Sequence, residues 1–325
     1  MAVPTSVSLV VVNYNGLEWI DGCLESIFAQ TRPAQQVLVV DNASSDSSPQ
    51  QVRRRWPQAR LIELPENVGY AAACNRGIEA TSGELVALLN NDIELAPNWL
   101  EALLEQDRPP WDFWASRILF ASQEGLIDSA GDGMAVVGAA FKHGHGLPSG
   151  SHLQGREVFG PCGAAALYRR SLLEETGGFD EDFFLIYEDA DLSMRARLMG
   201  YRCLYVPQAL VRHHVNASIG TLSRTYVFYG QRNSEYVFWK NMPLLLLLLY
   251  LPERLLFNTL SFLYFLLRGR AAAFLHSKLD FLRNLGPLLQ KRKLVQQQRR
   301  LGASQLRRQL TRNWLKGRRN VREAA

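Results

Sequence analysis

The 325 residues are 47% hydrophobic and 21% charged, which is ample apolar material for a core and more chain than one usual domain of roughly 100–200 residues needs. The net charge of +5 is uneven, because residues 268–325 hold sixteen Lys or Arg against two acids, about +14, which leaves about −9 on residues 1–267. The four cysteines have no Cys-x-x-Cys pair or other zinc-type spacing, so we expect free thiols in a reducing cytoplasm.

Strands and helices are predicted to alternate along the first 110 residues. Residues 7–12, VSLVVV, are a continuous aliphatic run typical of a strand buried on both faces of a parallel sheet. A helix is predicted over 17–29, where leucine and isoleucine recur at helical spacing. Further strands are predicted at 37–41, 60–64 and 85–90, and further helices at 47–55, 68–80 and 97–105. This alternation indicates βαβ units and a mostly parallel sheet flanked by helices.

The pattern is less regular after residue 110. Glycine-rich loops are predicted at 131–150 and a strand at 163–168. A helix at 189–199 and a strand at 201–206 complete the α/β body.

Polar residues end two of the predicted strands, where an open α/β sheet binds its ligands. The first strand ends in NYNG, from Asn13 to Gly16, and the second in DNASSD, beginning at Asp41. The first turn lacks G-x-G-x-x-G, so its backbone cannot approach a pyrophosphate in the Rossmann manner. Asp41 can accept hydrogen bonds from a ribose or base; the alternative is that it and the residues after it shape a turn and cap the next helix.

The strand at 85–90 ends in NNDIEL, with Asn90, Asn91 and Asp92 at its tip. A carboxylate in this position suits a hard divalent ion that shares its other ligand positions with substrate phosphates. The alternative is an asparagine-rich turn.

Residues 183–202, FFLIYEDADLSMRARLMGYR, place Glu188, Asp189 and Asp191 within four positions. Crowding raises the proton affinity of one carboxylate, which suits a general base, while Arg195 and Arg197 can hold the others ionised. The alternative is helix capping and dipole stabilisation, worth about 0.3–2 kcal/mol for each acid.

Two adjacent histidines, His213 and His214 in VRHH, follow the last predicted strand. Either can ligate a metal as neutral imidazole, although most single surface histidines have no such role.

Six motifs, in this order, resemble glycosyltransferase family 2, and within it the bacterial rhamnosyltransferase-like branch: VSLVVVNYNG, VLVVDNASSD, NVGYAAACNRG, GELVALLNNDIEL, GGFDEDFFLIYEDADLSMRARLMGYR and VRHH. The resemblance covers about residues 5–220. It implies a GT-A fold and an inverting transfer from a nucleotide-diphosphate sugar, with Mg²⁺ or Mn²⁺ as cofactor. It also implies a catalytic domain at 1–220, divided into a nucleotide-sugar half at 1–110 and an acceptor half at 111–220, before a helical region at 221–325.

The resemblance also implies roles for single residues. Asp189 falls where the family places its catalytic base, with Glu188 and Asp191 as supporting or acceptor-binding groups. Asp92 is the last acid of the family's Asp-x-Asp motif and would bind the metal, together with His213. The donor-binding positions implied are Val12, Asn13, Tyr14, Asp41, Asn67, Asn75 and Asn91.

The sequence departs from the family pattern at Asn90, which stands where the first acid of Asp-x-Asp is expected. An amide can orient a water or a sugar hydroxyl, but it brings no charge to the ion. This departure shifts metal binding onto Asp92, His213 and the diphosphate.

The carboxyl-terminal third has two apolar runs, 244–251 and 255–267, separated by Pro252, Glu253 and Arg254. A spanning helix needs about 20 predominantly apolar residues, so we expect two short amphipathic segments in the bilayer interface rather than a span.

The basic tail that follows is predicted to be helical and attracted to anionic lipid, by about 1 kcal/mol per basic residue. The alternatives are a solvated charged face or a contact in an oligomer. Nucleic acid is not expected as a partner, because the tail carries one aromatic residue after 281, Trp314, and no binding motif.

The resulting expectation is a transferase on the cytoplasmic face of the bacterial inner membrane, peripheral or monotopic, that extends a lipid-linked or cell-surface glycan. By resemblance the first candidate donor is dTDP-L-rhamnose, with UDP-hexoses as the alternative. A sugar-nucleotide pyrophosphorylase would instead need a glycine- and lysine-rich phosphate loop near the first strand, and NYNG is not one. A non-catalytic nucleotide-sugar-binding protein would not need the acids at 188–191.

Overall fold

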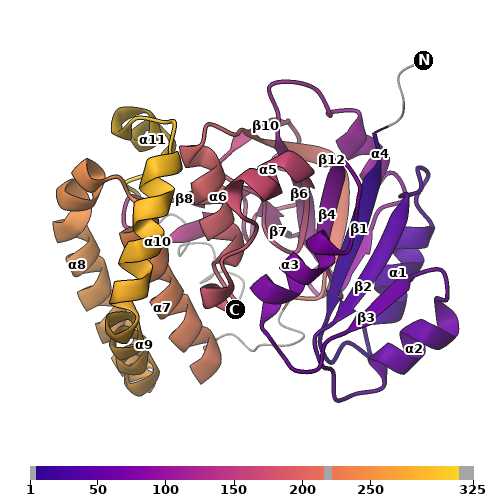
Figure 1. Cartoon of the computed structure of the whole chain (residues 1–325), viewed down its shortest axis with the longest axis horizontal. Helices are drawn as coiled ribbons and strands as arrows, with labels where there is room; N and C mark the ends of the chain where they lie inside the picture. The colour runs from indigo at the N-terminus through magenta and orange to yellow at the C-terminus, as the bar shows by residue number, and fades with distance from the viewer. Residues whose placement is uncertain (1–4, 216–221, 315–325) are drawn as a thin grey trace.

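A ten-stranded sheet runs through the middle of the molecule, with helices on both faces and a further helical layer at one side (Figure 1). The computed structural model describes residues 5–215 and 222–314. The main strand order is β10-β12-β6-β11-β4-β1-β2-β3, with β5 paired to β12 and β7 to β6. The strands are β1 (Val7–Asn13), β2 (Gln36–Asp41), β3 (Arg60–Glu63), β4 (Leu85–Asn90), β5 (Ile93–Leu95), β6 (Phe113–Phe120), β7 (Ile127–Ala130), β10 (Arg156–Val158), β11 (Ala165–Arg169) and β12 (Cys203–His213).

The sheet is parallel across β1 to β4 and mixed elsewhere. Strands β4, β1, β2 and β3 all pair in parallel, so their carboxyl ends meet at one edge. Strand β11 is antiparallel to both of its neighbours, and β5, β7 and β10 also pair antiparallel. The expectation of a mostly parallel sheet therefore holds for the first half, whereas the irregular second half adds strands that the sequence pattern did not predict.

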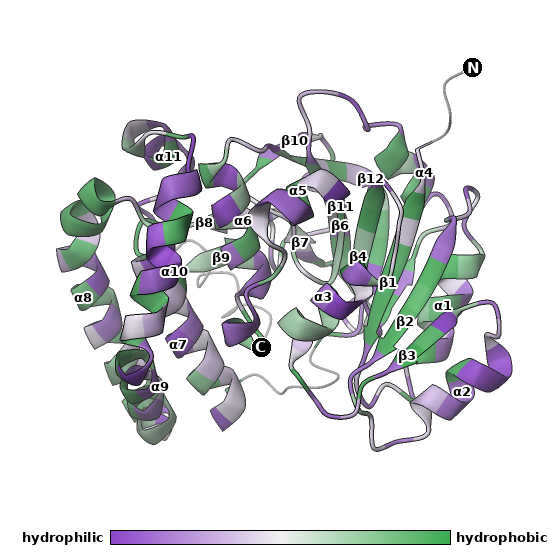
Figure 2. Ribbon diagram, in the orientation of Figure 1, coloured by the Kyte–Doolittle hydropathy of each residue, from purple (hydrophilic) through white to green (hydrophobic). Residues whose placement is uncertain are grey.

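The helices of the α/β body cover both faces of this sheet. Both faces need cover because alternate residues of β1 are apolar on each side. Leu9 and Val11 pack toward one face and Val10 and Val12 toward the other, and all four are buried. Figure 2 shows the central strands as almost continuously hydrophobic. The helices are α1 (Ile20–Phe28), α2 (Ser48–Arg55), α3 (Tyr70–Glu79), α4 (Trp99–Leu104), α5 (Arg170–Thr176), the short η1 (Glu181–Phe183) and α6 (Glu188–Leu198).

A two-stranded hairpin, β8 (Asp132–Met134) and β9 (Ala140–Lys142), lies within the segment predicted as glycine-rich loops. Its residues share a hydrophobic core with α6 and with the carboxyl-terminal helices. Those helices are α7 (Arg224–Asn241), α8 (Leu244–Leu267), α9 (Ala271–Arg283), α10 (Leu285–Gln298) and α11 (Ala303–Gln309).

Helix α8 corrects one expectation, because it runs through Pro252 as a single helix of 24 residues. Proline removes one backbone donor and usually breaks or kinks a helix. Here buried residues on both sides of it, such as Tyr250, Arg254 and Phe257, hold the helix against the body. Among the described residues, α8 is the one helix long and apolar enough to cross a membrane, by length and composition alone.

The predicted helical character of the basic tail is confirmed in α10 and α11, and the part of that prediction at 315–325 lies outside the described residues. The division at residue 220 stays a prediction.

Candidate active site

The carboxyl ends of β1, β2 and β4 are joined by one buried hydrogen-bond chain. Asn13 Nδ2 donates to Asp41 Oδ1 at 2.7 Å and to Ser48 Oγ at 2.8 Å, while Asn91 Nδ2 donates to Asn13 Oδ1 at 2.8 Å. Gly16 makes room for this chain, since a Cβ there would lie 2.1 Å from Asn91 Nδ2. Three predicted donor-binding residues, distant in sequence, are thus brought together at one sheet edge.

Asp41 also shapes the turn after β2, as the structural alternative predicted. Its Oδ2 accepts from the Ser44 N–H at 2.9 Å and its Oδ1 from Ser44 Oγ at 2.6 Å. At the same edge, Val12 is buried and Tyr14 is exposed. A donor would therefore meet an edge whose shape is already set by hydrogen bonds within the protein.

The two other predicted donor residues hold loops. Asn67 Oδ1 accepts from Asn42 Nδ2 and from the Gly69 N–H, both at 3.0 Å, beside the same edge. Asn75 lies within α3, where its amide exchanges two hydrogen bonds of 2.9 Å with the backbone of Phe179. Asn75 therefore ties α3 to the segment before the acidic cluster and has a structural partner at both ends of its amide.

Asp92 and His213 lie face to face, although 121 positions separate them in the sequence. Asp92 directly precedes β5, and His213 ends β12, which pairs with β5. Asp92 Oδ1 lies 3.3 Å from His213 Nε2. Asp92 Oδ1 and Asn90 Oδ1 are both buried and accept no hydrogen bond from the described residues. A carboxylate and an imidazole with unused acceptor atoms beside them fit a divalent ion.

Sequence reasoning missed the group behind His213. Asp128, fully buried on β7, places Oδ2 3.0 Å from His213 Nδ1 and binds Lys142 Nζ at 2.7 Å and 2.9 Å. Burial disfavours its charge, yet Lys142, His145 and His213 hold the pKa of Asp128 well below its usual value. Burial would lower the pKa of His213, but its hydrogen bond to Asp128 and the nearby carboxylate of Asp92 raise it to about 9. The sequence signal that could have identified Asp128 is an acid inside the short strand IDSA.

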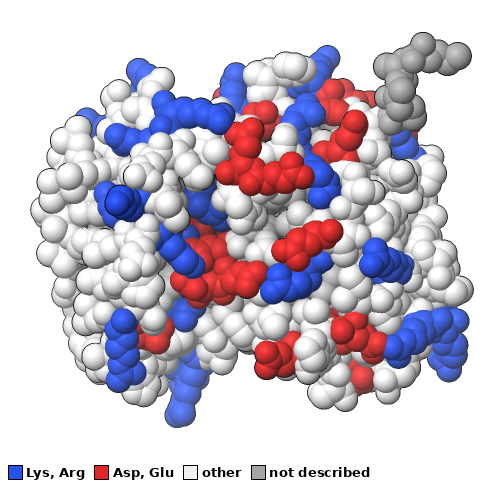
Figure 3. Space-filling model, in the orientation of Figure 1, with Lys and Arg blue, Asp and Glu red and all other residues white. Residues whose placement is uncertain are grey.

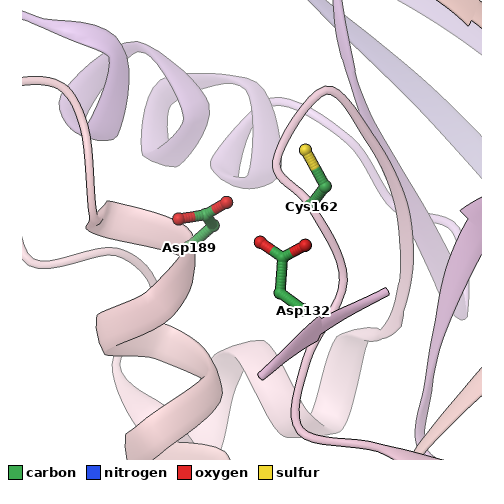
Figure 4. A group of neighbouring side chains, drawn as sticks. All are labelled: Asp132, Cys162 and Asp189. Carbon is green, nitrogen blue, oxygen red and sulfur yellow. The ribbon is translucent and has the colours of Figure 1, made fainter. Parts of the chain in front are cut away.

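Asp189 lies in the first turn of α6 and is held by two backbone groups. Its Oδ2 accepts from the Gly163 N–H and its Oδ1 from the Ala190 N–H, each at 2.7 Å. Asp132 of β8 and Cys162, which precedes β11, converge on it, so that one polar atom from each of the three lies within 4.8 Å of the others. Figure 4 shows the carboxylates of Asp132 and Asp189 side by side. Sequence reasoning missed Asp132, because only the hairpin brings it here.

These acids, of which Glu188 is buried and Asp132 and Asp189 are half-buried, hold protons tightly. Burial raises the pKa of Asp189 above its usual value, although its backbone hydrogen bonds oppose the shift. Burial and the charge of Asp189 raise the pKa of Asp132 to about 7 and that of Glu188 to about 8. Burial also raises the pKa of the Cys162 thiol well above its usual value, and a protonated thiol is a poor ligand for hard ions. The arrangement therefore suits proton transfer better than it suits a second metal.

The loop before Glu188 has an unusual backbone. Three non-glycine residues in it have positive φ: Phe184 (59°), Ile186 (65°) and Tyr187 (76°). Such conformations cost about 1–3 kcal/mol each and persist where the surroundings enforce them. Asn233 of α7 is fully buried, and its Nδ2 lies within hydrogen-bond distance of the carbonyl oxygens of Phe183, Leu185 and Ile186. No local sequence signal pointed to Asn233.

Asp191 lies on the other side of α6 and is fully buried. Its carboxylate binds Arg195 Nε and Lys240 Nζ, both at 2.8 Å, which joins α6 to α7. The structure thus gives it interior partners, and its predicted acceptor-binding role stays a prediction. The expected pairing of Arg195 with the cluster is seen, whereas that of Arg197 is wrong, because Arg197 binds Glu157 at 2.6 Å.

Comparison with known families gives a match over half of the chain. The model described as glycosyl transferase family 2 matches residues 8–177, and that of glycosyl transferase family group 2 matches residues 143–276. The N-acetylglucosaminyl-diphospho-decaprenol L-rhamnosyltransferase of Mycobacterium tuberculosis is 29% identical, over 73% of this chain and 87% of its own length. The O-antigen biosynthesis protein RfbC of Myxococcus xanthus is 31% identical over 65% of this chain, which spans 17% of that longer protein.

Solved structures share the fold at low identity. GalNAc-T7 with UDP, GalNAc and Mn²⁺ has a TM-score of 0.60 at 15% identity, covering 74% of this chain and 48% of that one. The mannosyltransferase PcManGT of Pyrobaculum calidifontis, in complex with GDP-Man and Mn²⁺, has a TM-score of 0.54 at 20% identity, covering 86% and 88%. At these identities the likeness concerns the fold alone.

Proposed function

The chain belongs to glycosyltransferase family 2, with a GT-A fold and a nucleotide-sugar donor, and from this premise we propose that it is an inverting, metal-dependent transferase that uses Asp189 as its base. The observation that carries the proposal is a pair of groups: the buried Asp92 facing His213 at 3.3 Å, and the half-buried Asp189 beside Asp132 in a separate cluster. One group suits a diphosphate with its ion, and the other suits a hydroxyl that must lose a proton.

On the donor side, Asp92 and His213 would hold Mg²⁺ or Mn²⁺, which when bound neutralises the negative charge that develops on the departing diphosphate. Asn90 adds an acceptor oxygen without charge. The chain through Asn13, Asp41 and Asn91 orients the strand ends against which the nucleoside would bind.

On the acceptor side, Asp189 takes the proton of the attacking hydroxyl as that oxygen bonds to the anomeric carbon from the face opposite the diphosphate. The Gly163 N–H fixes the carboxylate that accepts this proton. Burial of Asp189, Asp132 and Glu188 raises their proton affinity, which supports the base role.

The proposed donor is dTDP-L-rhamnose, supported by the Mycobacterium tuberculosis relative. At 29% identity this support is weak for the sugar, and a UDP-hexose is the competing donor. The fold does not select the nucleotide, since structures of the same fold are described with UDP and with GDP-Man.

The proposed acceptor is a lipid-linked or cell-surface glycan, and the proposed location is the cytoplasmic face of the bacterial inner membrane, with the protein peripheral or monotopic. The relative's name supports the acceptor, because it specifies a sugar diphosphate on a polyprenol.

A donor panel tests the proposal. The full chain is incubated with dTDP-rhamnose, UDP-glucose, UDP-GlcNAc and GDP-mannose, with Mn²⁺, with Mg²⁺ or with EDTA, and the products are separated by ion-exchange chromatography. Slow, metal-dependent release of one nucleoside diphosphate is expected. Release of nucleoside triphosphate when pyrophosphate is added would point to a pyrophosphorylase instead, and binding of a donor without any turnover would contradict catalysis.

A further inference from the structure

The outer face of α8 is apolar along its whole length. Thirteen of its 24 residues are exposed, and none of the thirteen carries a charge. They are Leu244, Leu245, Leu248, Leu249, Pro252, Leu255, Leu256, Thr259, Leu260, Leu263, Tyr264, Leu266 and Leu267. Two hydroxyls are among them, that of Thr259, which donates to the Leu255 carbonyl at 3.1 Å, and the phenol of Tyr264. Monomeric soluble proteins rarely expose a contiguous apolar patch of this kind unless something binds it.

The inner face of the same helix carries the charge. Arg254 is 1% exposed, with Nη2 2.8 Å from Glu235 Oε1 and Nη1 2.9 Å from Ser234 Oγ. Lys278 of α9 also binds Glu235, and Asn258 Nδ2 donates to Glu235 Oε1 at 2.8 Å. A surface helix of a soluble protein has the reverse arrangement, with its apolar stripe inward and its charges outward. Helix α8 is thus anchored to the body by these polar contacts together with buried apolar residues such as Leu246, Tyr250 and Phe257, and it turns its other leucines outward.

A second apolar stripe lies on α9, which packs against α8 through Phe262, Phe265 and Phe274. The exposed residues Leu275, Leu279 and Leu282 recur at helical spacing along it. We call the exposed residues of α8 and this stripe the leucine face.

The charge around the leucine face is basic. Residues 222–314 hold sixteen Lys or Arg and three acids, and each acid is in an ion pair: Glu235 with Arg254, Glu253 with Arg312, and Asp280 with Arg232. Arg268 and Arg283, which follow α8 and end α9, are exposed. Figure 3 shows this side of the molecule, at the left, as mostly uncharged surface with scattered basic side chains. A second copy would bring like charge against like charge, whereas anionic lipid headgroups complement it.

We propose that the leucine face lies flat in the interface of an anionic bilayer, with α8 parallel to the membrane plane and its leucines about 5–10 Å into the headgroup and acyl boundary. This proposal deepens the proposed function. It rests on that function only in one respect, because a lipid-linked acceptor would explain why the protein binds a membrane. A span is disfavoured, because Glu253 and Arg254 stand near the middle of α8 and each charge would cost about 2.5–3.5 kcal/mol or more at a bilayer centre. A span would also separate Arg254 from Glu235.

Vesicle flotation of the full chain tests the proposal. The probes are vesicles of phosphatidylcholine alone and of phosphatidylcholine with 30% phosphatidylglycerol. We expect binding to the mixed vesicles, and at least tenfold weaker binding to the neutral ones. Leu248→Asp/Leu255→Asp/Leu263→Asp should abolish binding. Leu255→Asp alone should weaken it severalfold, whereas Leu153→Asp, a residue equally exposed on the catalytic body, should not.

Circular dichroism shows whether the same variants are folded. Donor hydrolysis by them separates the two proposals, since the leucine face is remote from the acids that carry the chemistry. Failure of the wild-type chain to bind either vesicle, or unchanged binding by the triple variant, would overturn the membrane proposal even if donor hydrolysis proceeds. A wild-type dimer in light scattering that becomes a monomer in the triple variant would also overturn the proposal, because a second copy would then cover the leucine face. Resistance of the bound protein to an alkaline carbonate wash would show a span instead.

Discussion

Asp189 differs from the acids beside it in how its oxygens are held. Two backbone N–H groups fix both of its oxygens, whereas one oxygen of Glu188 is buried without a hydrogen-bond partner among the described residues and Asp191 is neutralised inside the helical layer. The sequence predicted a special carboxylate among the three, because three acids exceed what a helix cap requires. It did not predict Asp132, which is 57 positions away and arrives with the hairpin.

Asp189→Asn should abolish transfer while donor affinity stays within a few-fold, because the amide keeps the size of the side chain but cannot accept the proton. Its oxygen can still accept from one of the two backbone N–H groups that hold the carboxylate. Turnover with acceptor and donor affinity by calorimetry measure the two effects. Asp182→Asn, an exposed acid in the preceding segment, is the control and should retain full turnover. A variant at 189 with most of its turnover intact would show that another group is the base.

Asp92→Ala should weaken donor binding and abolish the response to the metal, since the remaining imidazole of His213 is a poor site for a hard ion on its own. A titration of donor affinity against Mn²⁺ concentration measures this, with Glu94→Gln, a partly exposed acid two residues further on, as the control. A variant whose metal dependence matched the wild type would rule out Asp92 as a ligand.

At the scale of elements, β1 to β4 and their helices were predictable because continuous apolar runs and helical spacing are local signals. The strand β12 was predicted only to residue 206, yet it continues to His213, since its pairing with β6 and β5 stabilises the remainder. Pro252 shows the opposite case, in which a local breaker is overridden by packing on both sides of it.

The strained loop at 184–187 depends on an element that begins almost forty residues later. Asn233→Ala should leave the carbonyls of Leu185 and Ile186 without their side-chain donor, at a cost of about 1–3 kcal/mol, whereas the Phe183 carbonyl still accepts from Arg232. It should lower turnover more than donor affinity, because Glu188 and Asp189 follow directly. Urea unfolding and steady-state kinetics measure these effects. Thr259→Ala, an exposed change in another carboxyl-terminal helix, should alter neither quantity. Equal losses in turnover and donor affinity would indicate general damage rather than misplacement of the acids.

For the whole molecule, the acids fall into two groups with opposite effects on stability. Burial would raise the pKa of Glu235, but Arg254 and Lys278 lower it to about 2, so that its ion pairs stabilise the fold above about pH 4.5 and are lost as the pH falls toward 2. Glu188 acts in the other direction, because burial favours its protonated form in the fold. Its cost is absent below about pH 4.5 and grows as the pH rises toward 8.

Glu188→Gln should therefore raise the free energy of unfolding at pH 8, by on the order of 1–3 kcal/mol, and leave it unchanged at pH 4. Urea unfolding at the two pH values measures the difference. Glu124→Gln, an exposed acid, should have no effect at either pH. A variant with the same stability as the wild type at pH 8 would show that Glu188 is not buried with a raised pKa.

The sequence by itself determined the parallel half of the sheet, the strand-end acids and the cluster at 188–191, because these features depend on residues close together along the chain. Only the tertiary structure decided which acids act together: Asp92 meets His213 through the pairing of β12 with β5, and Asp132 meets Asp189 through the β8–β9 hairpin. It also decided that the apolar side of α8 faces outward. A helical pattern shows that two faces differ, but the partner of Arg254, Glu235 on another helix, determines which of them is buried.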